Sequence, residues 1–145
     1  MSQSDDLERL VVGGHALARI AARKTGNDAP AAQWRAISLL RSDGPRRVGE
    51  LAAMCRTTQP GMTRLLGHLE DLGFVERAAD PADSRATIVR ALPAGEAALQ
   101  RWQEQMRDAL QPIFSDLSEA DWAAVNRVAT ILDEHTRVEA GSIIR

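Results

Sequence analysis

The sequence predicts a mainly α-helical protein that carries one small, two-stranded β-hairpin. Three features within residues 46–92 predict it: a short helical segment, a tight turn leading into a second helical segment (together about 49–72), and two β-prone runs around a polar tip (74–92). Apolar residues recur at three- and four-residue spacing in the helical part and give way to short β-branched runs. This order is typical of a winged helix-turn-helix, a motif that places one helix in a DNA groove and a loop beside it.

The first helix of the motif is expected to begin at Gly49-Glu50. Glycine is acceptable at an N-cap, and an acid suits the first turn, where the helix dipole is positive. The turn Cys55-Arg56-Thr57 is too short for the second helix to run antiparallel to the first. Thr58 is the expected N-cap of the second helix, and Pro60 is tolerated in its first turn because that position needs no N–H donor.

The second helix is expected to have two different faces. The apolar face, predicted to be buried, consists of Met62, Leu65, Leu66, Leu69 and Leu72. The opposite face carries small, hydrogen-bonding or cationic residues: Gln59, Gly61, Thr63, Arg64, Gly67 and His68. Such a face suits the major groove, where side chains read base edges and glycine permits close approach. His68 fits a DNA contact or a solvated helix position equally well, and Gly73 is expected to end the helix in a left-handed conformation.

The predicted wing consists of the β-prone runs 74–77 and 87–90 around a turn rich in aspartate and proline. Arg85 lies where the tip returns to the sheet, and Asp83 is placed to brace its guanidinium group. A pre-oriented arginine is what a narrow, electronegative minor groove attracts. We therefore expect Asp83 and Arg85 to act together at the DNA.

Taken together, these segments resemble the MarR family of bacterial transcription regulators. The matching elements are Gly49-Glu50-Leu51-Ala52, Thr58-Gln59-Pro60, Thr63-Arg64-Leu65-Leu66 with Leu69-Glu70, Gly73-Phe74-Val75-Glu76-Arg77, Asp80-Pro81 with Asp83-Ser84-Arg85, and Leu92-Pro93-Ala94-Gly95. Each is weak alone, but their order and spacing are specific, and the resemblance covers roughly residues 5 to 140. The family's wing usually has two adjacent arginines after its aspartate. Here Ser84 replaces the first, which leaves Arg85 as the only cation of the wing tip.

The resemblance implies a sequence-specific regulator, a repressor, that binds double-stranded DNA as a homodimer. Two-fold symmetry then matches a palindromic operator, with recognition helices one DNA turn apart, about 34–36 Å. The family also suggests release by a small aromatic or phenolic effector held between the dimerisation helices and the DNA reader. The expected DNA-contacting residues are Arg46, Arg47 and Arg56 on phosphates, Thr58, Gln59, Thr63, Arg64 and His68 on the reading helix, and Asp83 and Arg85 on the wing.

Residues 5–42 and 93–140 are expected to form dimerisation helices. Their apolar residues recur at helical spacing: Leu7, Leu10, Val11, Leu17, Ile20 and Ala21; Trp34, Ile37 and Leu40; Leu99, Trp102, Met106, Leu110 and Ile113; Trp122, Val125, Val128, Ile131 and Leu132. Val138, Ile143 and Ile144 in the tail add to a surplus that one winged helix could not cover. Pro30 and Gly44-Pro45 mark the ends of one helix, and Ser118–Asp121 is a capping-box-like start of another.

Composition fits a single domain over residues 1–145, with 44% apolar residues and a net charge of −2. Residues 41–90 hold eight arginines against seven acids, so the expected reader is slightly more basic than the rest. The acidic start and the charges interrupting the following apolar positions favour neither a signal peptide nor a membrane span. One cysteine excludes an intrachain disulfide framework and suits the cytoplasm.

No pattern predicts catalysis, a cofactor or a metal site. The chain has no phosphate-binding glycine loop, nucleophile elbow or paired metal ligands, and its three histidines lie far apart. Cys55 is expected to be a small buried hydrophobic residue, although Arg56 beside it could lower its pKa and permit redox sensing. The alternative function is a dimeric winged-helix interaction module without DNA binding. Ser84 and the weak basic excess favour it, whereas Arg64 and Arg85 argue against it.

Overall fold

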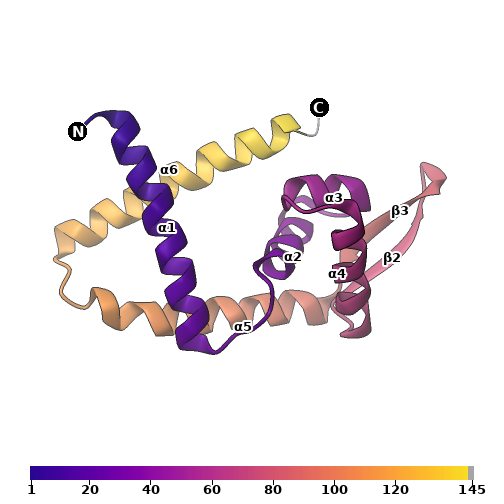
Figure 1. The fold of residues 1–145 in the computed structure, drawn as a ribbon, viewed down its shortest axis with the longest axis horizontal. Coiled ribbons are helices and arrows are strands. Elements are labelled where there is room, and N and C mark those ends of the chain that lie inside the picture. The colour runs from indigo at the N-terminus through magenta and orange to yellow at the C-terminus, as the bar shows by residue number, and fades with distance from the viewer. Residues whose placement is uncertain (144–145) are drawn as a thin grey trace. The chain divides into compact units, whose positions relative to one another are not determined.

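The computed structural model describes residues 1–143 of the chain, with side chains up to residue 137. The described helices are α1 (Gln3–Thr25), α2 (Ala31–Asp43), α3 (Val48–Met54), α4 (Gln59–Asp71), α5 (Pro93–Leu110) and α6 (Glu119–Ile143), with a 3-10 turn at Gln111–Phe114. The strands are β1 (Arg46–Arg47), β2 (Val75–Asp80) and β3 (Asp83–Ala91) (Figure 1). The expected mainly helical winged helix-turn-helix is confirmed. The predicted tail side chains of Val138, Ile143 and Ile144 lie outside the described residues.

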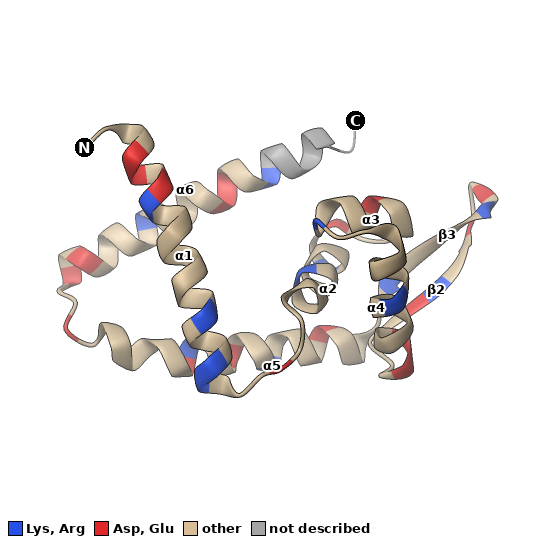
Figure 2. Cartoon of the chain, in the orientation of Figure 1, with Lys and Arg blue, Asp and Glu red and all other residues tan. Residues whose placement is uncertain are grey.

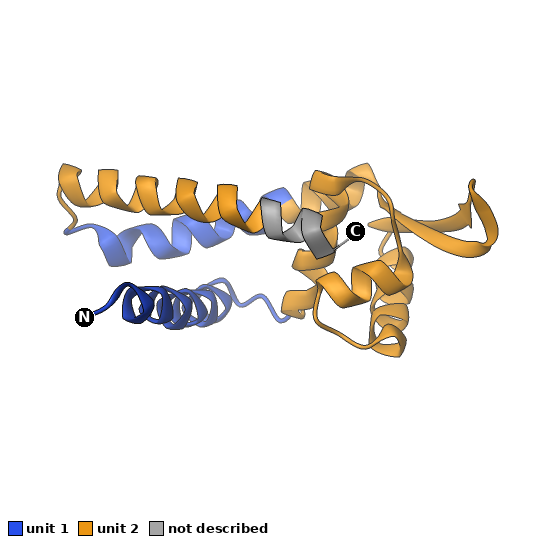
Figure 3. Ribbon diagram, turned by 90° about the horizontal axis from the view of Figure 1, so that it is seen from above, with its two compact units in different colours: residues 1–29, 100–116 blue, residues 30–99, 117–145 orange. Residues whose placement is uncertain are grey.

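The chain forms two compact units, coloured separately in Figure 3. One unit comprises residues 1–29 and 100–116, and the other comprises residues 30–99 and 117–145. The helix-turn-helix and the wing both belong to the second unit. Helix α5 begins in that unit and continues into the first.

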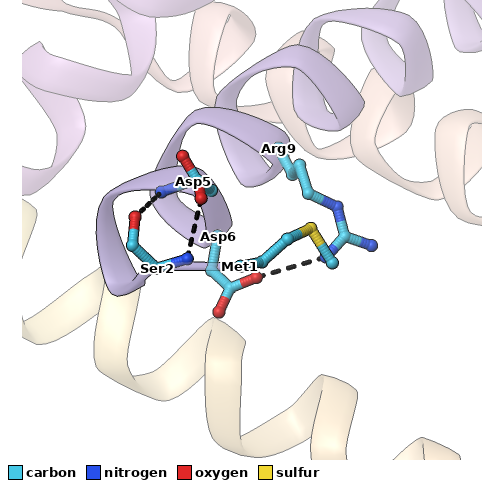
Figure 4. Close-up of polar contacts among 5 residues, drawn as sticks. All are labelled: Met1, Ser2, Asp5, Asp6 and Arg9. Atoms are coloured by element: carbon cyan, nitrogen blue, oxygen red, sulfur yellow. Dashed lines mark hydrogen bonds and ion pairs between the residues drawn. The ribbon is translucent and has the colours of Figure 1, made fainter.

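Helix α1 begins with a capping box that the sequence analysis did not identify. The backbone N–H of Asp5 donates to Ser2 Oγ at 3.2 Å, and the backbone N–H of Ser2 donates to Asp5 Oδ2 at 2.7 Å (Figure 4). These hydrogen bonds from Ser2 hold the pKa of Asp5 below its ordinary value. Arg9 adds an ion pair with Asp6 one turn further on, at 3.2 Å. The acidic start of the chain therefore stabilises a helix terminus, where N–H groups lack partners.

The hydrophobic core of the second unit lies between α2, α3, α4, the sheet and the start of α5. Its largest fully buried side chains are Ile37, Leu51, Met62, Leu66, Leu69, Val75, Val89 and Leu99. Helix α4 buries Met62, Leu66 and Leu69 of the expected face, whereas Leu65 is half-buried and the C-cap residue Leu72 is 46% exposed. Gly73 follows with a φ of +74°, and the N–H of Phe74 donates to the carbonyl of Leu69 at 2.9 Å. The expected left-handed helix end at Gly73 is thus confirmed as a Schellman motif.

The sheet has a third strand beyond the two expected for the wing. Its order is β1-β3-β2 and both pairings are antiparallel, with Arg46 opposite Val89 and Arg47 opposite Ile88. Strands β2 and β3 form the long hairpin that projects past α3 and α4 (Figure 1). Two residues are too few to show β-periodicity in a sequence, which is why β1 was missed.

The base of the wing and the start of α5 are in close contact. The N–H of Leu92 donates to the carbonyl of Phe74 at 2.9 Å. A Cβ atom on buried Gly95 would lie 2.2 Å from the same carbonyl oxygen. Glycine at position 95 therefore allows the start of α5 to pack against the backbone of Phe74, just after the turn that ends α4.

Helix α6 begins at the capping box expected at Ser118, whose Oγ accepts the N–H of Asp121 at 3.1 Å. None of the described side chains of α6 is buried within the chain. Its large apolar side chains with 36–47% exposure are Trp122, Val125, Ile131 and Leu132. In the other unit, Leu7, Leu10 and Val11 of α1 are 43–62% exposed. Across the described residues, no helix combines the length and the apolarity needed to span a membrane.

Candidate DNA-binding surface

The recognition helix α4 starts as the sequence predicted. Thr58 is its N-cap, and its Oγ1 accepts the backbone N–H of Gly61 at 3.1 Å, with Pro60 in the first turn. A Cβ on Gly61 would lie 2.9 Å from Thr58 Oγ1 and 3.0 Å from Thr57 Oγ1. Glycine at position 61 thus leaves room for both threonine hydroxyls at the helix terminus.

The turn between α3 and α4 contains a residue in an unusual backbone conformation. Arg56 has a φ of +55°, whereas the other described residues with positive φ are glycines. The N–H of Arg56 donates to the carbonyl of Ala53, and the N–H of Thr57 donates to the carbonyl of Ala52 at 3.0 Å, which closes the end of α3.

Helix α3 begins at Val48 and not at the expected Gly49-Glu50, because the chain passes directly from β1 into the helix with Arg47 as the N-cap.

A hollow of about 640 Å³ lies between α3, α4 and the wing. Its lining residues are Arg47, Val48, Gly49, Glu50, Gln59, Thr63, Arg77, Arg85, Ala86 and Thr87. It brings together four residues expected at the DNA: Arg47, Gln59, Thr63 and Arg85. Thr63 Oγ1 donates to the carbonyl of Gln59 at 3.0 Å, which fixes the hydroxyl against the helix.

The other expected contact residues lie outside this hollow. Arg56, Arg64 and His68 are exposed, Thr58 is the helix cap, and Asp83 lies at the wing tip. Arg46 is half-buried, and its Nη1 donates to the carbonyl of Pro45 at 3.0 Å. The guanidinium of Arg46 is therefore used partly within the fold.

The arginines around the hollow differ in their partners. Arg47 donates from Nε and Nη2 to Asp80 Oδ2 at 3.0 and 2.9 Å. Arg77 donates from Nη2 to Glu70 Oε1 at 3.0 Å, and its backbone N–H donates to Glu70 Oε2 at 3.1 Å. Among the described residues, Arg85 has no ion-pair partner. Arg85 therefore presents an uncompensated positive charge beside the recognition helix.

The expected brace between Asp83 and the guanidinium of Arg85 is wrong. Asp83 Oδ1 accepts the backbone N–H of Arg85 at 3.1 Å, so the carboxylate stabilises the start of β3. An aspartate two residues before an N–H commonly bonds the backbone in this way, which competes with a side-chain pair. Figure 2 shows acidic and basic residues together at this tip.

Similarity to known proteins identifies the family of this chain. The profile of the MarR family matches residues 28–86. An uncharacterised HTH-type transcriptional regulator of Mycobacterium leprae is 31% identical over 106 residues, which cover 70% of this chain and 74% of that protein. The chain belongs to the MarR family. The HTH-type transcriptional repressor IacR of Pseudomonas putida is 27% identical over 124 residues, covering 80% of this chain and 74% of that protein.

Solved MarR-family structures share the fold. Wild-type MarR from E. coli in its apo form superimposes with a TM-score of 0.69 at 23% identity, covering 87% of this chain and 95% of that one. The protein is thus a DNA-binding transcription regulator, and its family is one of regulators and not of enzymes. Within the described residues, no cluster of three histidine, cysteine or acidic side chains has the arrangement of a metal site.

Three residues of this MarR-family surface were missed by the sequence analysis as site residues: Glu70, Arg77 and Asp80. Hydrogen bonds from the Arg77 side chain are the main cause that lowers the pKa of Glu70. The backbone N–H of Ala82 is the main cause that lowers the pKa of Asp80, and Arg47 adds to it. The ion pairs Glu70–Arg77 and Arg47–Asp80 each join two different elements, so no local pattern in the sequence predicts them.

Cys55 is buried, as expected, within the turn of the MarR-family motif. Burial raises the pKa of its thiol, and the cation that opposes this effect is Arg35. The alternative in which the neighbouring Arg56 lowers this pKa is not supported, because Arg35 is the cation that acts on the thiol and burial has the larger effect. Arg35 Nη2 donates to the carbonyl of Cys55 at 3.2 Å and so holds α2 against this turn.

Proposed function

We propose that this MarR-family protein is a repressor that binds a palindromic operator as a homodimer. The observation that carries the proposal is the hollow in which Gln59 and Thr63 of α4 face the unpaired Arg85 of the wing. A helix and a loop that converge on one concave surface can engage a major groove and the adjacent minor groove together. Chromosomal DNA as the target places this action in the cytoplasm.

Base reading is assigned to Gln59, Thr63 and Arg64 on the exposed side of α4. Glutamine pairs with adenine and arginine with guanine through two hydrogen bonds in the major groove, each worth about 1–3 kcal/mol of discrimination. Arg64→Ala should therefore lower affinity by that amount and relax specificity at one operator position, as measured by fluorescence anisotropy on a set of single-substituted duplexes. Equal affinity of Arg64→Ala and wild type would show that the reading face is assigned wrongly.

Contacts with the phosphates of the DNA backbone are assigned to Arg47 and Arg56. Arg46 is expected to contribute less to them, because its guanidinium also bonds the carbonyl of Pro45. Thr58 and His68 lie at the two ends of the reading face, and His68 also fits a solvated helix position. Each phosphate contact contributes about 0.9 to the slope of log K against log salt. Single alanine variants of the three arginines should shallow this slope by about two units per dimer where the contact exists.

The wing is assigned to the minor groove through Arg85, because Ser84 carries no charge to share the role. Arg85→Ala should weaken binding to all duplexes and abolish any preference for A·T-rich flanks, with little change in major-groove preference. Asp83→Ala should give a weaker form of the same defect, since it removes a bond that shapes the start of β3. Unchanged affinity and salt slope for Arg85→Ala would mean that the wing does not contact DNA.

The homodimer is inferred from the exposed apolar residues of α1 and α6. Leu10 and Val11 in one unit, and Trp122 and Leu132 in the other, are each at least 43% exposed. Apolar stripes of this kind mark association surfaces, and a two-fold pair matches a palindromic site. Light scattering should give about twice the chain mass of 15.8 kDa. A stable monomer at micromolar concentration would contradict this inference.

Repression is proposed from a similar protein, and effector release from the resemblance to the MarR family. The similar Pseudomonas putida protein is named a repressor. A small aromatic or phenolic acid bound near the dimerisation helices would release the operator. Titration of the protein–operator complex with salicylate, with cyclohexanecarboxylate as the non-aromatic control, tests this effector class.

The alternative expected from the sequence, a dimeric interaction module without DNA binding, is not favoured, because the matching family and the similar HTH-type proteins are transcription regulators. An electrophoretic mobility shift with the DNA upstream of the chain's own gene separates the two functions. A specific shift that competes with unlabelled operator supports the repressor. No shift at low salt and micromolar protein would favour the interaction module.

A further inference from the structure

Asp80 is the most constrained carboxylate of the wing. Its side chain is 14% exposed, and it lies where the register between β2 and β3 shifts. Oδ1 accepts the backbone N–H of Ala82 at 2.9 Å, and Oδ2 accepts Nε and Nη2 of Arg47 at 3.0 and 2.9 Å. Both oxygens are therefore in use, one within the wing turn and the other on a different element.

The partner of this carboxylate occupies a special place in the fold. Arg47 is the last residue of β1, the N-cap of α3, and part of the lining of the hollow. Its side chain is 46% exposed, so the guanidinium is held by Asp80 on one side and open to solvent on the other. A guanidinium has five N–H donors in a fixed plane. Asp80 accepts from Nε and Nη2, so the N–H groups of Nη1 stay available for a phosphate.

We propose that Asp80 is a positioning residue for DNA binding, which orients the guanidinium of Arg47 toward a phosphate and couples the wing turn to the start of α3. The proposal rests on the DNA surface proposed above. It adds a residue that does not itself contact DNA. Orientation of a long side chain before binding removes part of the entropy that binding would otherwise cost.

The direction in which Asp80→Asn changes DNA affinity separates a positioning role from a simple effect of charge. Asp80 is an anion near a surface that would bind a polyanion, so Coulomb repulsion alone predicts tighter DNA binding when the charge is removed. Asp80→Asn keeps a side-chain oxygen for the N–H of Ala82 but weakens the pairing with Arg47. Positioning therefore predicts weaker binding, by about 3- to 10-fold per dimer, as expected for groups that act as a coupled pair.

The matched control is Glu76→Gln. Glu76 pairs with Arg90 across β2 and β3, and neither residue lines the hollow. This variant changes the charge by the same amount and breaks an ion pair in the same hairpin. It should leave operator affinity unchanged or slightly raised.

A double-mutant cycle with Arg47→Gln tests whether Asp80 acts through Arg47. In the Arg47→Gln protein, Asp80→Asn should cause no further loss. Asp80→Ala, which also removes the acceptor for Ala82, should in addition weaken the preference for A·T-rich flanks that depends on Arg85. If Asp80 contributed only to stability, both Asp80→Asn and Asp80→Ala would lower the unfolding midpoint. The two variants would then not differ in their effect on the preference for A·T-rich flanks.

Arg47→Lys provides a test that leaves the wing turn intact. Lysine keeps the charge but cannot form the fork with Asp80, so it should bind operator nearly as weakly as Arg47→Gln.

The positioning role would be overturned if Asp80→Asn or Arg47→Lys bound operator with wild-type affinity. It would also be overturned if Asp80→Asn still lowered affinity in the Arg47→Gln protein. Both outcomes would leave the proposed DNA surface in place. Wild-type affinity in both Arg47→Gln and Arg85→Ala would instead overturn the proposed surface and the positioning role with it.

Discussion

Arg56→Gly should stabilise the protein and weaken its binding to DNA. Arg56 has a φ of +55°, a conformation that costs a residue with a Cβ about 1–2 kcal/mol. Glycine relieves this cost but loses about 0.5–1 kcal/mol more conformational entropy than alanine on folding. The side chain of Arg56 makes no hydrogen bond or ion pair with the described residues that would offset the gain.

The net stabilisation expected from these values is about 0.5–1 kcal/mol, which raises the unfolding midpoint of a domain of this size by about 1–4 °C. Thermal and urea unfolding at fixed protein concentration measure it. The proposed phosphate contact is lost at the same time, so the salt slope of operator binding should shallow by about two units per dimer.

Arg56→Ala is the matched control, because it removes the same side chain and keeps the strained backbone. Both variants should bind DNA equally weakly, and only glycine should raise the midpoint. A midpoint for Arg56→Gly at or below that of Arg56→Ala would refute the strain argument. Wild-type DNA affinity in both would show that position 56 carries strain for some reason other than DNA.

Three further predictions concern the fold around the site. Gly95→Ala should destabilise the protein by about 1–3 kcal/mol or more in urea unfolding, because its Cβ would meet the carbonyl of Phe74 at 2.2 Å. Glu70→Gln should lower stability at pH 7, because Arg77 depresses the pKa of Glu70 below its ordinary value of 4.5. This stabilisation is present above pH 4.5 and is lost as the pH falls through the folded-state pKa, so the deficit of the variant should shrink in acid. Cys55→Ser should keep operator binding and leave the response to peroxide unchanged, because a buried thiol with a raised pKa is a poor nucleophile.

Each of these predictions has its own check. Gly67→Ala is the control for Gly95→Ala, since nothing lies within 4 Å of its added Cβ, and equal stability of the two variants would contradict the contact argument. Glu76→Gln is the control for the pH series, and a Glu70→Gln deficit that does not shrink as the pH falls below 4.5 would point to lost packing. Operator release by peroxide in the wild type but not in Cys55→Ser would identify Cys55 as a redox switch.

The sequence allowed the helices and the wing to be predicted where local chemistry determines them. Thr58, Gly73 and Ser118 each act through hydrogen bonds that span a few residues, so their positions were confirmed. Leu72 was assigned to the core because periodicity continues past the end of α4, whereas burial depends on what lies beside the last turn. The two residues of β1 form a strand only because β3 lies alongside them.

The candidate site was less predictable, because its electrostatics depend on pairs far apart in the chain. Arg47 and Asp80 are 33 residues apart, and nothing local links them. Arg85 lines the hollow together with Gln59 and Thr63 of α4, but the partner expected for its guanidinium was wrong, since Asp83 bonds the backbone. Residue types indicated a DNA-binding surface, whereas the division of its arginines into paired and unpaired ones required the fold.

In the homodimer proposed above, the exposed face of α6 would link the stability of this protein to its concentration. A 25-residue helix none of whose described side chains is buried within its own chain gains little tertiary stabilisation from that chain. With the homodimer proposed above, unfolding becomes linked to dissociation, and each tenfold dilution removes about 1.4 kcal/mol from the apparent free energy of unfolding. Dilution itself would then limit how much folded, operator-competent protein is present.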